Sequence, residues 1–311
     1  MTPRFGRVLT AMISPFSKDE ELDIEGAQVL AKWLVEQGNE GLVIAGTTGE
    51  SPTLTHEEQI NLITAVVEAV DVPVIAGAGS NDTKAAVELT ESCTEVGASG
   101  ILTVTPYYNR PSQQGLLAHF SAVAESTDLP VMLYDIPVRS GRKIDTSTIL
   151  QLADEVENIV ALKDAAGDVG ETARLIAAAP EGFEVYSGED SLTLSLLSVG
   201  AVGTVSVASH WSTPETTELM KSFFAGDFNR AVEVNRRLIP SYDFESGDLT
   251  PNPIPTKAMM KILNLPGGDC RLPMGPEPEW LAEKARGILS LSLIHISEPT
   301  RRYAISYAGV G

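Results

Sequence analysis

The sequence predicts a (β/α)8 TIM barrel, a closed parallel sheet surrounded by helices, with a C-terminal helical extension. A short apolar run followed by a longer segment of helical periodicity recurs along the 311-residue chain, mostly at steps of about 30 residues, the size of one strand–helix unit. The apolar runs are continuous rather than alternating, as in Leu42–Ala45. Such runs are typical of strands that are buried on both faces of a parallel sheet.

Eight segments qualify as strands, and start and stop signals mark the helices between them. Thr55 followed by Glu58 predicts a helix N-terminus, and Gly38 and Gly97 predict helix ends. An open doubly wound sheet is the structural alternative, but the first strand–helix turn carries no Gly-x-Gly-x-x-Gly. The expected strands are Val8–Phe16, Gly41–Gly46, Pro73–Ala78, Gly100–Pro106, Pro130–Pro137, Ile159–Ala165, Glu184–Gly188 and Gly203–Ala208.

After about Ser212 the strand pattern stops, and four more helices are expected. We therefore divide the chain into a barrel core (1–212), a last barrel helix with a C-terminal helical extension (213–290) and a tail (291–311) whose composition resembles translated adapter sequence and is expected to be non-native. The segment Pro251–Pro255 is expected to be a rigid linker. The expected helices are Pro214–Ala225, Phe228–Phe244, Thr256–Leu263 and Pro278–Leu289.

Composition excludes several classes of function. The formal charge of −20 argues against a nucleic-acid partner and against an anionic membrane surface. Cys93 and Cys270 show no clustered Cys/His spacing, so we expect neither a disulfide framework nor a metal site. Residues 1–15 do not resemble a signal peptide, and no apolar run reaches the ~18 residues of a membrane span. The expected location is the cytoplasm.

Lys163 is the most informative residue, because it interrupts the apolar strand Ile159–Leu162. Burying a charge at such a position is costly, so burial favours the neutral amine, which can attack a carbonyl carbon and form a Schiff base. The alternative is a structural lysine that pairs with Asp164 or another neighbour. The choice between the two readings depends on what surrounds the amine.

Other polar residues follow neighbouring strands, at the barrel end where active sites form. Tyr134 carries a phenol that could donate or accept a proton, although it could equally pack in the core. Thr47 and Thr48 offer hydroxyl and backbone N–H groups, or else form an ordinary turn. Arg139 could bind a carboxylate, or lie in solvent. Together with Lys163 these residues indicate a Schiff-base lyase or aldolase that acts on an α-keto acid.

The same strand ends resemble one known family over about residues 4–289. The chain is similar to the dihydrodipicolinate synthase (4-hydroxy-tetrahydrodipicolinate synthase) family of pyruvate-dependent Schiff-base aldolases. The motifs that carry the resemblance are Gly46-Thr47-Thr48-Gly49-Glu50, Tyr107-Tyr108-Asn109-Arg110-Pro111, Tyr134-x-x-Pro137, Lys163, Asn252-Pro253-Ile254-Pro255 and Arg271-Leu272-Pro273-Met274.

The resemblance implies condensation of pyruvate, bound as an imine, with L-aspartate-4-semialdehyde in lysine biosynthesis through diaminopimelate, without a metal or organic cofactor. It also implies a homotetramer, a dimer of tight dimers. The implied catalytic residues are Lys163 for the imine and Tyr134, Thr47 and Tyr108 for a proton relay, with Tyr108 lent by the neighbouring subunit. The implied substrate-binding residues are Thr48, Arg139, Gly188 and Val205.

The chain departs from lysine-inhibited members of the family at one place. His56, Asn81 and Tyr107 match their feedback site, but Gln59 and Ala85 stand where those members often have histidine and glutamate. Weak or absent inhibition by lysine is therefore expected.

The alternatives to the synthase are another pyruvate-dependent aldolase, such as N-acetylneuraminate lyase or a keto-deoxy-sugar acid aldolase, a non-catalytic binding protein and a phosphate-substrate isomerase. Intact Lys163, Tyr134 and Thr47 argue against a non-catalytic protein. The acidic sequence Gly188-Glu189-Asp190 argues against a phosphate site.

Overall fold

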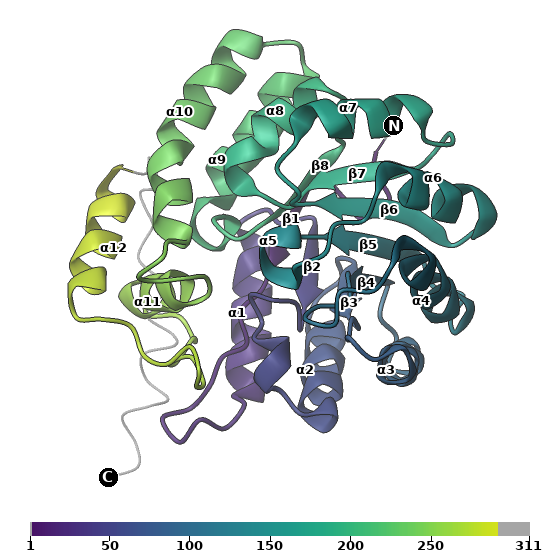
Figure 1. Ribbon diagram of the computed structural model, residues 1–311. Coiled ribbons are helices and arrows are strands. Elements are labelled where there is room, and N and C mark those ends of the chain that lie inside the picture. The colour runs from purple at the N-terminus through teal and green to yellow at the C-terminus, as the bar shows by residue number, and fades with distance from the viewer. Residues whose placement is uncertain (1, 292–311) are drawn as a thin grey trace.

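The computed structural model describes residues 2–291, in which eight parallel strands close into a barrel in the order of the sequence (Figure 1). Parallel pairing joins each strand to the next and β8 to β1, which confirms the predicted fold class. The strands are β1 Val8–Ala11, β2 Gly41–Ile44, β3 Val74–Gly77, β4 Gly100–Val104, β5 Val131–Asp135, β6 Ile159–Asp164, β7 Glu184–Ser187 and β8 Gly203–Ser206.

The observed strands lie within the predicted ones but end sooner. The first was expected to reach Phe16, yet β1 ends at Ala11. Met12 and Ile13 remain buried beyond its end, so the apolar run continues into the loop although the ladder stops. Burial alone therefore does not mark a strand end, because the loops that follow the strands also pack into the core.

Helices alternate with the strands and surround the barrel (Figure 1). Thr55 forms the predicted capping box with Glu58 at the start of α2, and Gly38 and Gly97 follow helix ends with positive φ. Two 3-10 turns, Ser51–Thr53 and Asp190–Leu192, lie in loops. The barrel helices are α1 Ile24–Glu36, α2 His56–Ala69, α3 Thr83–Glu95, α4 Gln113–Glu125, α5 Pro137–Ser140, α6 Thr146–Glu155, α7 Val169–Ala178, α8 Thr193–Ser198 and α9 Ser209–Phe224.

The core has two main layers. The larger lies between the strands and the surrounding helices, and the smaller fills the barrel interior. Phe5 belongs to the interior layer and lies against Tyr186 and the first residue of β4, Gly100. This aromatic packing fills the N-terminal end of the barrel.

Three helices extend the chain beyond α9, and they are α10 Phe228–Glu245, α11 Ile254–Ile262 and α12 Trp280–Leu291. All four predicted C-terminal helices are present. The last barrel helix begins at Ser209 rather than Pro214, because a short turn precedes a kink at Ser212 and Pro214 lies just after it. Residues 292–311 of the expected tail lie outside the described residues, and the domain division stays a prediction. Among residues 2–291, no helix is long and apolar enough to cross a membrane.

Candidate active site

Neighbouring strands bring Lys163 and Tyr134 together inside the barrel. The two are register partners on β6 and β5, and both are almost fully buried, with 5% and 4% of their surface exposed. Lys163 Nζ lies 4.2 Å from the centre of the Tyr134 ring. The pair lies toward the C-terminal ends of its strands, where a (β/α)8 barrel places its chemistry.

Asp164 does not pair with Lys163. The Asp164 carboxylate accepts hydrogen bonds from the Thr172 hydroxyl and the Ala166 N–H, outside the barrel. Consecutive residues of a strand point to opposite faces, so Lys163 faces inward while Asp164 faces the helices. The structure therefore excludes Asp164 as the partner that the structural alternative for Lys163 named first.

Glu189 is the acidic side chain that influences Lys163. It follows β7 and is exposed. Partial desolvation raises the pKa of the Glu189 carboxyl, while the positive charge of Lys163 acts in the opposite direction. The buried lysine therefore has an acid within electrostatic range.

Gly188 lies against the lysine side chain, and Val205 belongs to the barrel interior. A Cβ on Gly188 would come within 2.8 Å of Lys163 Cγ, so only glycine leaves room for the lysine side chain. The Gly188 N–H donates to the Asp164 carbonyl across the β6–β7 boundary at 2.7 Å. Val205 is buried on β8 in the interior layer.

The loop after β2 carries Thr47 and Thr48 at the same end of the barrel. Thr48 is buried and Thr47 is half-buried. The Thr48 hydroxyl accepts a hydrogen bond of 2.9 Å from the Asn252 side-chain amide. This contact ties the loop to the segment that precedes α11.

A buried ion pair fixes the end of this loop. Glu50 has a left-handed backbone conformation, and its carboxylate lies 2.6 Å from Lys257 Nζ, with both side chains buried. The carboxylate also accepts the Arg271 backbone N–H. Removing one partner of such a pair is strongly destabilising, because the remaining charge stays buried. The C-terminal extension therefore holds the Thr47–Thr48 loop in place.

Asn252 was not predicted as a site residue. Its segment was interpreted as a rigid linker and as one motif of the family resemblance, with no role in the site, but Asn252 contacts two predicted binding residues. In addition to the Thr48 contact, its carbonyl accepts from Arg139 Nη2 at 3.4 Å. The signal that could have identified it is a lone amide side chain in a proline-rich segment, because such a residue has little reason to be buried unless it makes hydrogen bonds.

Arg139 and Tyr108 lie at the outer edge of the site. Arg139 is exposed on α5, and Tyr108 is 90% exposed with a positive φ. Tyr108 is placed through its backbone, whose N–H donates to the Ser140 carbonyl at 3.3 Å. Within one chain the structure thus brings together Lys163, Tyr134 and Gly188. It links Thr48 to Arg139 through Asn252, while the Tyr108 ring stays at the surface.

No cluster of three or more His, Cys, Asp or Glu side chains suited to a metal ion occurs among residues 2–291.

Comparison with known proteins gives consistent results. The profile of the dihydrodipicolinate synthetase family matches residues 4–291. The chain is 48% identical over 273 residues to the 4-hydroxy-tetrahydrodipicolinate synthase of Moorella thermoacetica. The aligned region covers 87% of this chain and 92% of that protein.

Solved structures agree with the sequence relatives. The dihydrodipicolinate synthase of Bacillus anthracis superposes with a TM-score of 0.89 at 43% identity, covering 93% of this chain and 99% of that one. The chloride-inhibited dihydrodipicolinate synthase of Acinetobacter baumannii, complexed with pyruvate, gives a TM-score of 0.87 at 35% identity, covering 92% and 98%.

A parallel barrel with a buried lysine at a strand end, in contact with a tyrosine, defines the class of Schiff-base-forming lyases. Within that class, the chain belongs to the dihydrodipicolinate synthetase family. The predicted 4-hydroxy-tetrahydrodipicolinate synthase function is thereby confirmed, and the sugar-acid aldolase alternative is not favoured.

Proposed function

We propose that this chain condenses pyruvate with L-aspartate-4-semialdehyde through a Schiff base on Lys163, in the cytoplasm. The observation that carries the proposal is the Lys163 amine, buried in the barrel 4.2 Å from the Tyr134 ring centre and not paired with Asp164. The names of the relatives and the pyruvate complex of the A. baumannii protein support the choice of substrates.

The chemistry requires a neutral amine and a proton donor. The Lys163 nitrogen attacks the keto carbon of pyruvate, and water leaves as the protonated imine forms. That imine withdraws electrons, so a proton can leave the pyruvate methyl group. The resulting enamine carbon forms a bond to the aldehyde carbon of the second substrate, whose oxygen takes up a proton. The amine of that substrate then displaces Lys163, which returns to its starting state.

Tyr134 and Thr47 are assigned the proton transfers. The Tyr134 phenol lies next to the amine, where it can protonate the departing hydroxyl during imine formation. Thr47 follows β2 at the same end of the barrel and continues the relay toward solvent.

Two carboxylate-binding positions complete the site. Thr48 offers a hydroxyl that Asn252 orients, and we assign it to the pyruvate carboxylate. Arg139 is exposed at the mouth and presents a guanidinium for the carboxylate of the semialdehyde. Gly188 leaves room for the Lys163 side chain, and we assign Val205, buried in the barrel interior, to the substrate-binding wall.

A homotetramer made of two tight dimers explains the position of Tyr108. A ring that is 90% exposed on its own chain is free to complete the relay of a neighbouring subunit. Co-expression of Tyr108→Phe chains with Lys163→Ala chains tests this, because mixed dimers then contain one site with both residues. Recovery of activity above that of either variant is expected, and a mixture as inactive as the variants alone rules out the exchange.

Intact-mass measurement after borohydride reduction with pyruvate tests the Schiff base itself. The native chain should gain one reduced pyruvyl group, and Lys163→Ala should gain none. Lys84→Ala is the matched control, since Lys84 is an exposed lysine that should not alter the adduct. A native chain that takes up no pyruvate would exclude the proposed chemistry, and an adduct that persists in Lys163→Ala would exclude Lys163 as its carrier.

A further inference from the structure

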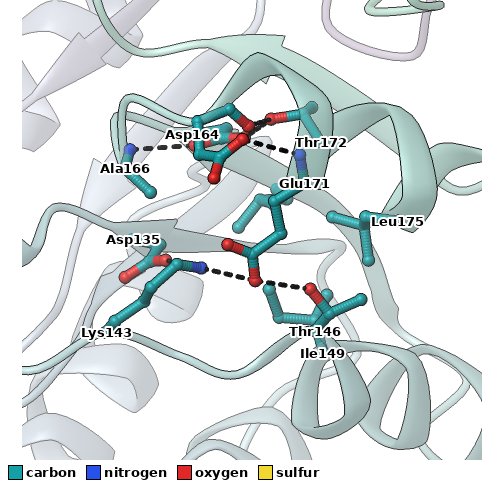
Figure 2. A pocket seen from close by; sticks show the side chains of 11 residues that line it. Asp135, Lys143, Thr146, Ile149, Asp164, Ala166, Glu171, Thr172 and Leu175 are labelled. Carbon is teal, nitrogen blue, oxygen red and sulfur yellow. Dashed lines mark hydrogen bonds and ion pairs between the residues drawn. The ribbon is translucent and has the colours of Figure 1, made fainter.

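Two buried carboxylates lie directly behind the proposed catalytic pair. Asp135 and Asp164 are register partners on β5 and β6, one position after Tyr134 and Lys163. Both are buried, and both face the outside of the barrel toward α6 and α7, where they line a small pocket (Figure 2). The same two strand ends therefore carry the reactive side chains inward and a pair of acids outward.

The two acids have different partners. Asp164 accepts hydrogen bonds from Ala166 and Thr172. Asp135 accepts the Ile144 N–H at 3.2 Å, and its other oxygen lies 3.5 Å from Lys143 Nζ.

Lys143 also reaches across to α7. Its Nζ lies 3.1 Å from Glu171, whose carboxylate in turn accepts from the Thr146 hydroxyl (Figure 2). Among the described residues that line the pocket, Lys143 is the one cation, opposed by Asp135, Asp164, Asp168 and Glu171.

The ionisation of Asp135 depends on the opposing charges of Lys143 and Asp164. Burial raises the pKa of Asp135 to about 6, the Lys143 charge opposes that shift, and the neighbouring Asp164 carboxylate adds to it. Two like charges on adjacent strands repel each other strongly when they are removed from water. The lysine offsets that repulsion while Asp135 is ionised.

We propose that Lys143 is a positioning residue for the Schiff-base chemistry: its charge keeps the ends of β5 and β6 paired and thereby holds Lys163 against Tyr134. This inference rests on the function proposed for Lys163. Lys143 contacts neither substrate nor reacting atoms, and acts through the two strands. Without its charge, the ionised Asp135 and Asp164 push the strand ends apart, and the Lys163–Tyr134 contact loosens.

The test is Lys143→Met in the full chain, which keeps the length of the side chain and removes its charge. The rate at which pyruvate forms the borohydride-reducible adduct should fall about tenfold at about pH 8, as expected for a small misplacement of reacting groups. The defect should shrink as the pH falls, because loss of the Lys143 charge leaves the pKa of Asp135 higher than in the native chain, and the carboxyl then takes up a proton that removes the repulsion. A purely structural role for the lysine would not produce this pH dependence.

The double variant Lys143→Met/Asp135→Asn provides the rescue. Asparagine removes one of the two like charges and can still accept the Ile144 N–H, so the rate should return to near the native value at about pH 8. Lys84→Met is the matched control, because it breaks an exposed ion pair with Glu88 on α3 and should leave the rate unchanged.

Each outcome decides the proposal. A native rate in Lys143→Met, or a defect that neither acid pH nor Asp135→Asn relieves, overturns it. If Lys143→Met fails to fold, a folded and active double variant still supports charge balance, and an unfolded or inactive double variant refutes it. Absence of any adduct in the native chain would instead remove the function proposed for Lys163.

Discussion

Two buried tyrosines of the barrel interior, Tyr134 and Tyr186, make different contacts. Tyr134 and Tyr186 both belong to the interior layer, and both are register partners of Lys163. The Tyr186 hydroxyl donates to Glu184 at the N-terminal end, and burial raises its pKa. The Tyr134 ring instead lies against the Lys163 amine. The two tyrosines pair with the same lysine, so the contacts of the side chain, rather than its position along the strand, decide whether a buried tyrosine supports the fold or takes part in the chemistry.

The largest expected effect comes from Tyr134→Phe. Loss of a proton-transfer group should lower kcat by about 10²- to 10⁴-fold. Tyr186→Phe should leave kcat unchanged and cost only about 1 kcal/mol of stability, the usual contribution of one hydrogen bond. Steady-state kinetics gives kcat of both variants, and urea unfolding gives their stability. Equal losses of kcat would contradict the different roles assigned to the two tyrosines.

Phe5→Ala should act on stability rather than chemistry. Phe5 is fully buried at the N-terminal end, so its removal should cost about 3–5 kcal/mol of the free energy of unfolding. The pyruvyl adduct should still form at low temperature, where the variant is folded. Urea unfolding measures the loss of stability, and intact-mass measurement detects the pyruvyl adduct. A folded variant that forms no adduct would show that the lower end takes part in the reaction.

Acid should weaken the attachment of the C-terminal segment near the site. Hydrogen bonds from Arg271 lower the pKa of Glu58 from 4.5 to about 2. A depressed carboxyl pKa stabilises the folded state above about pH 4.5, and this stabilisation is lost as the pH falls toward 2. Glu58→Gln should therefore be less stable than the native chain by up to about 1 kcal/mol at neutral pH, and the difference should narrow in acid. Denaturant unfolding at several pH values measures it, and a difference that grows in acid would contradict the assignment.

The smallest expected effect is that of free lysine. Because Gln59 and Ala85 replace residues common in inhibited members, millimolar lysine should leave the initial rate nearly unchanged. Gln59 here donates to the Ser51 carbonyl within its own loop. Strong inhibition in a rate assay would show that a lysine site forms without the expected side chains.

Local patterns were sufficient for most of the fold and for the central pair. Continuous apolar runs separated by helical periods predicted all eight strands, and a lysine inside such a run identified Lys163 without knowledge of its neighbours. The contacts of Asn252, Glu50 and Lys143 could not be predicted in this way. Each of these contacts joins two segments that are far apart in the sequence or lie on different elements. A polar residue in a loop belongs to no periodic pattern, so the sequence does not reveal its partner.

The sequence by itself determined the barrel, its polar end and the residue types available there. The reason is that the local spacing of apolar residues predicts which segments form strands and helices and which faces are buried. Only the tertiary structure decided which partner each charge has. It showed Asp164 facing outward, away from Lys163, and it placed Lys257 against Glu50. The reason is physical: a buried charge is stabilised by whatever the fold brings within a few ångströms, and sequence separation does not limit that choice.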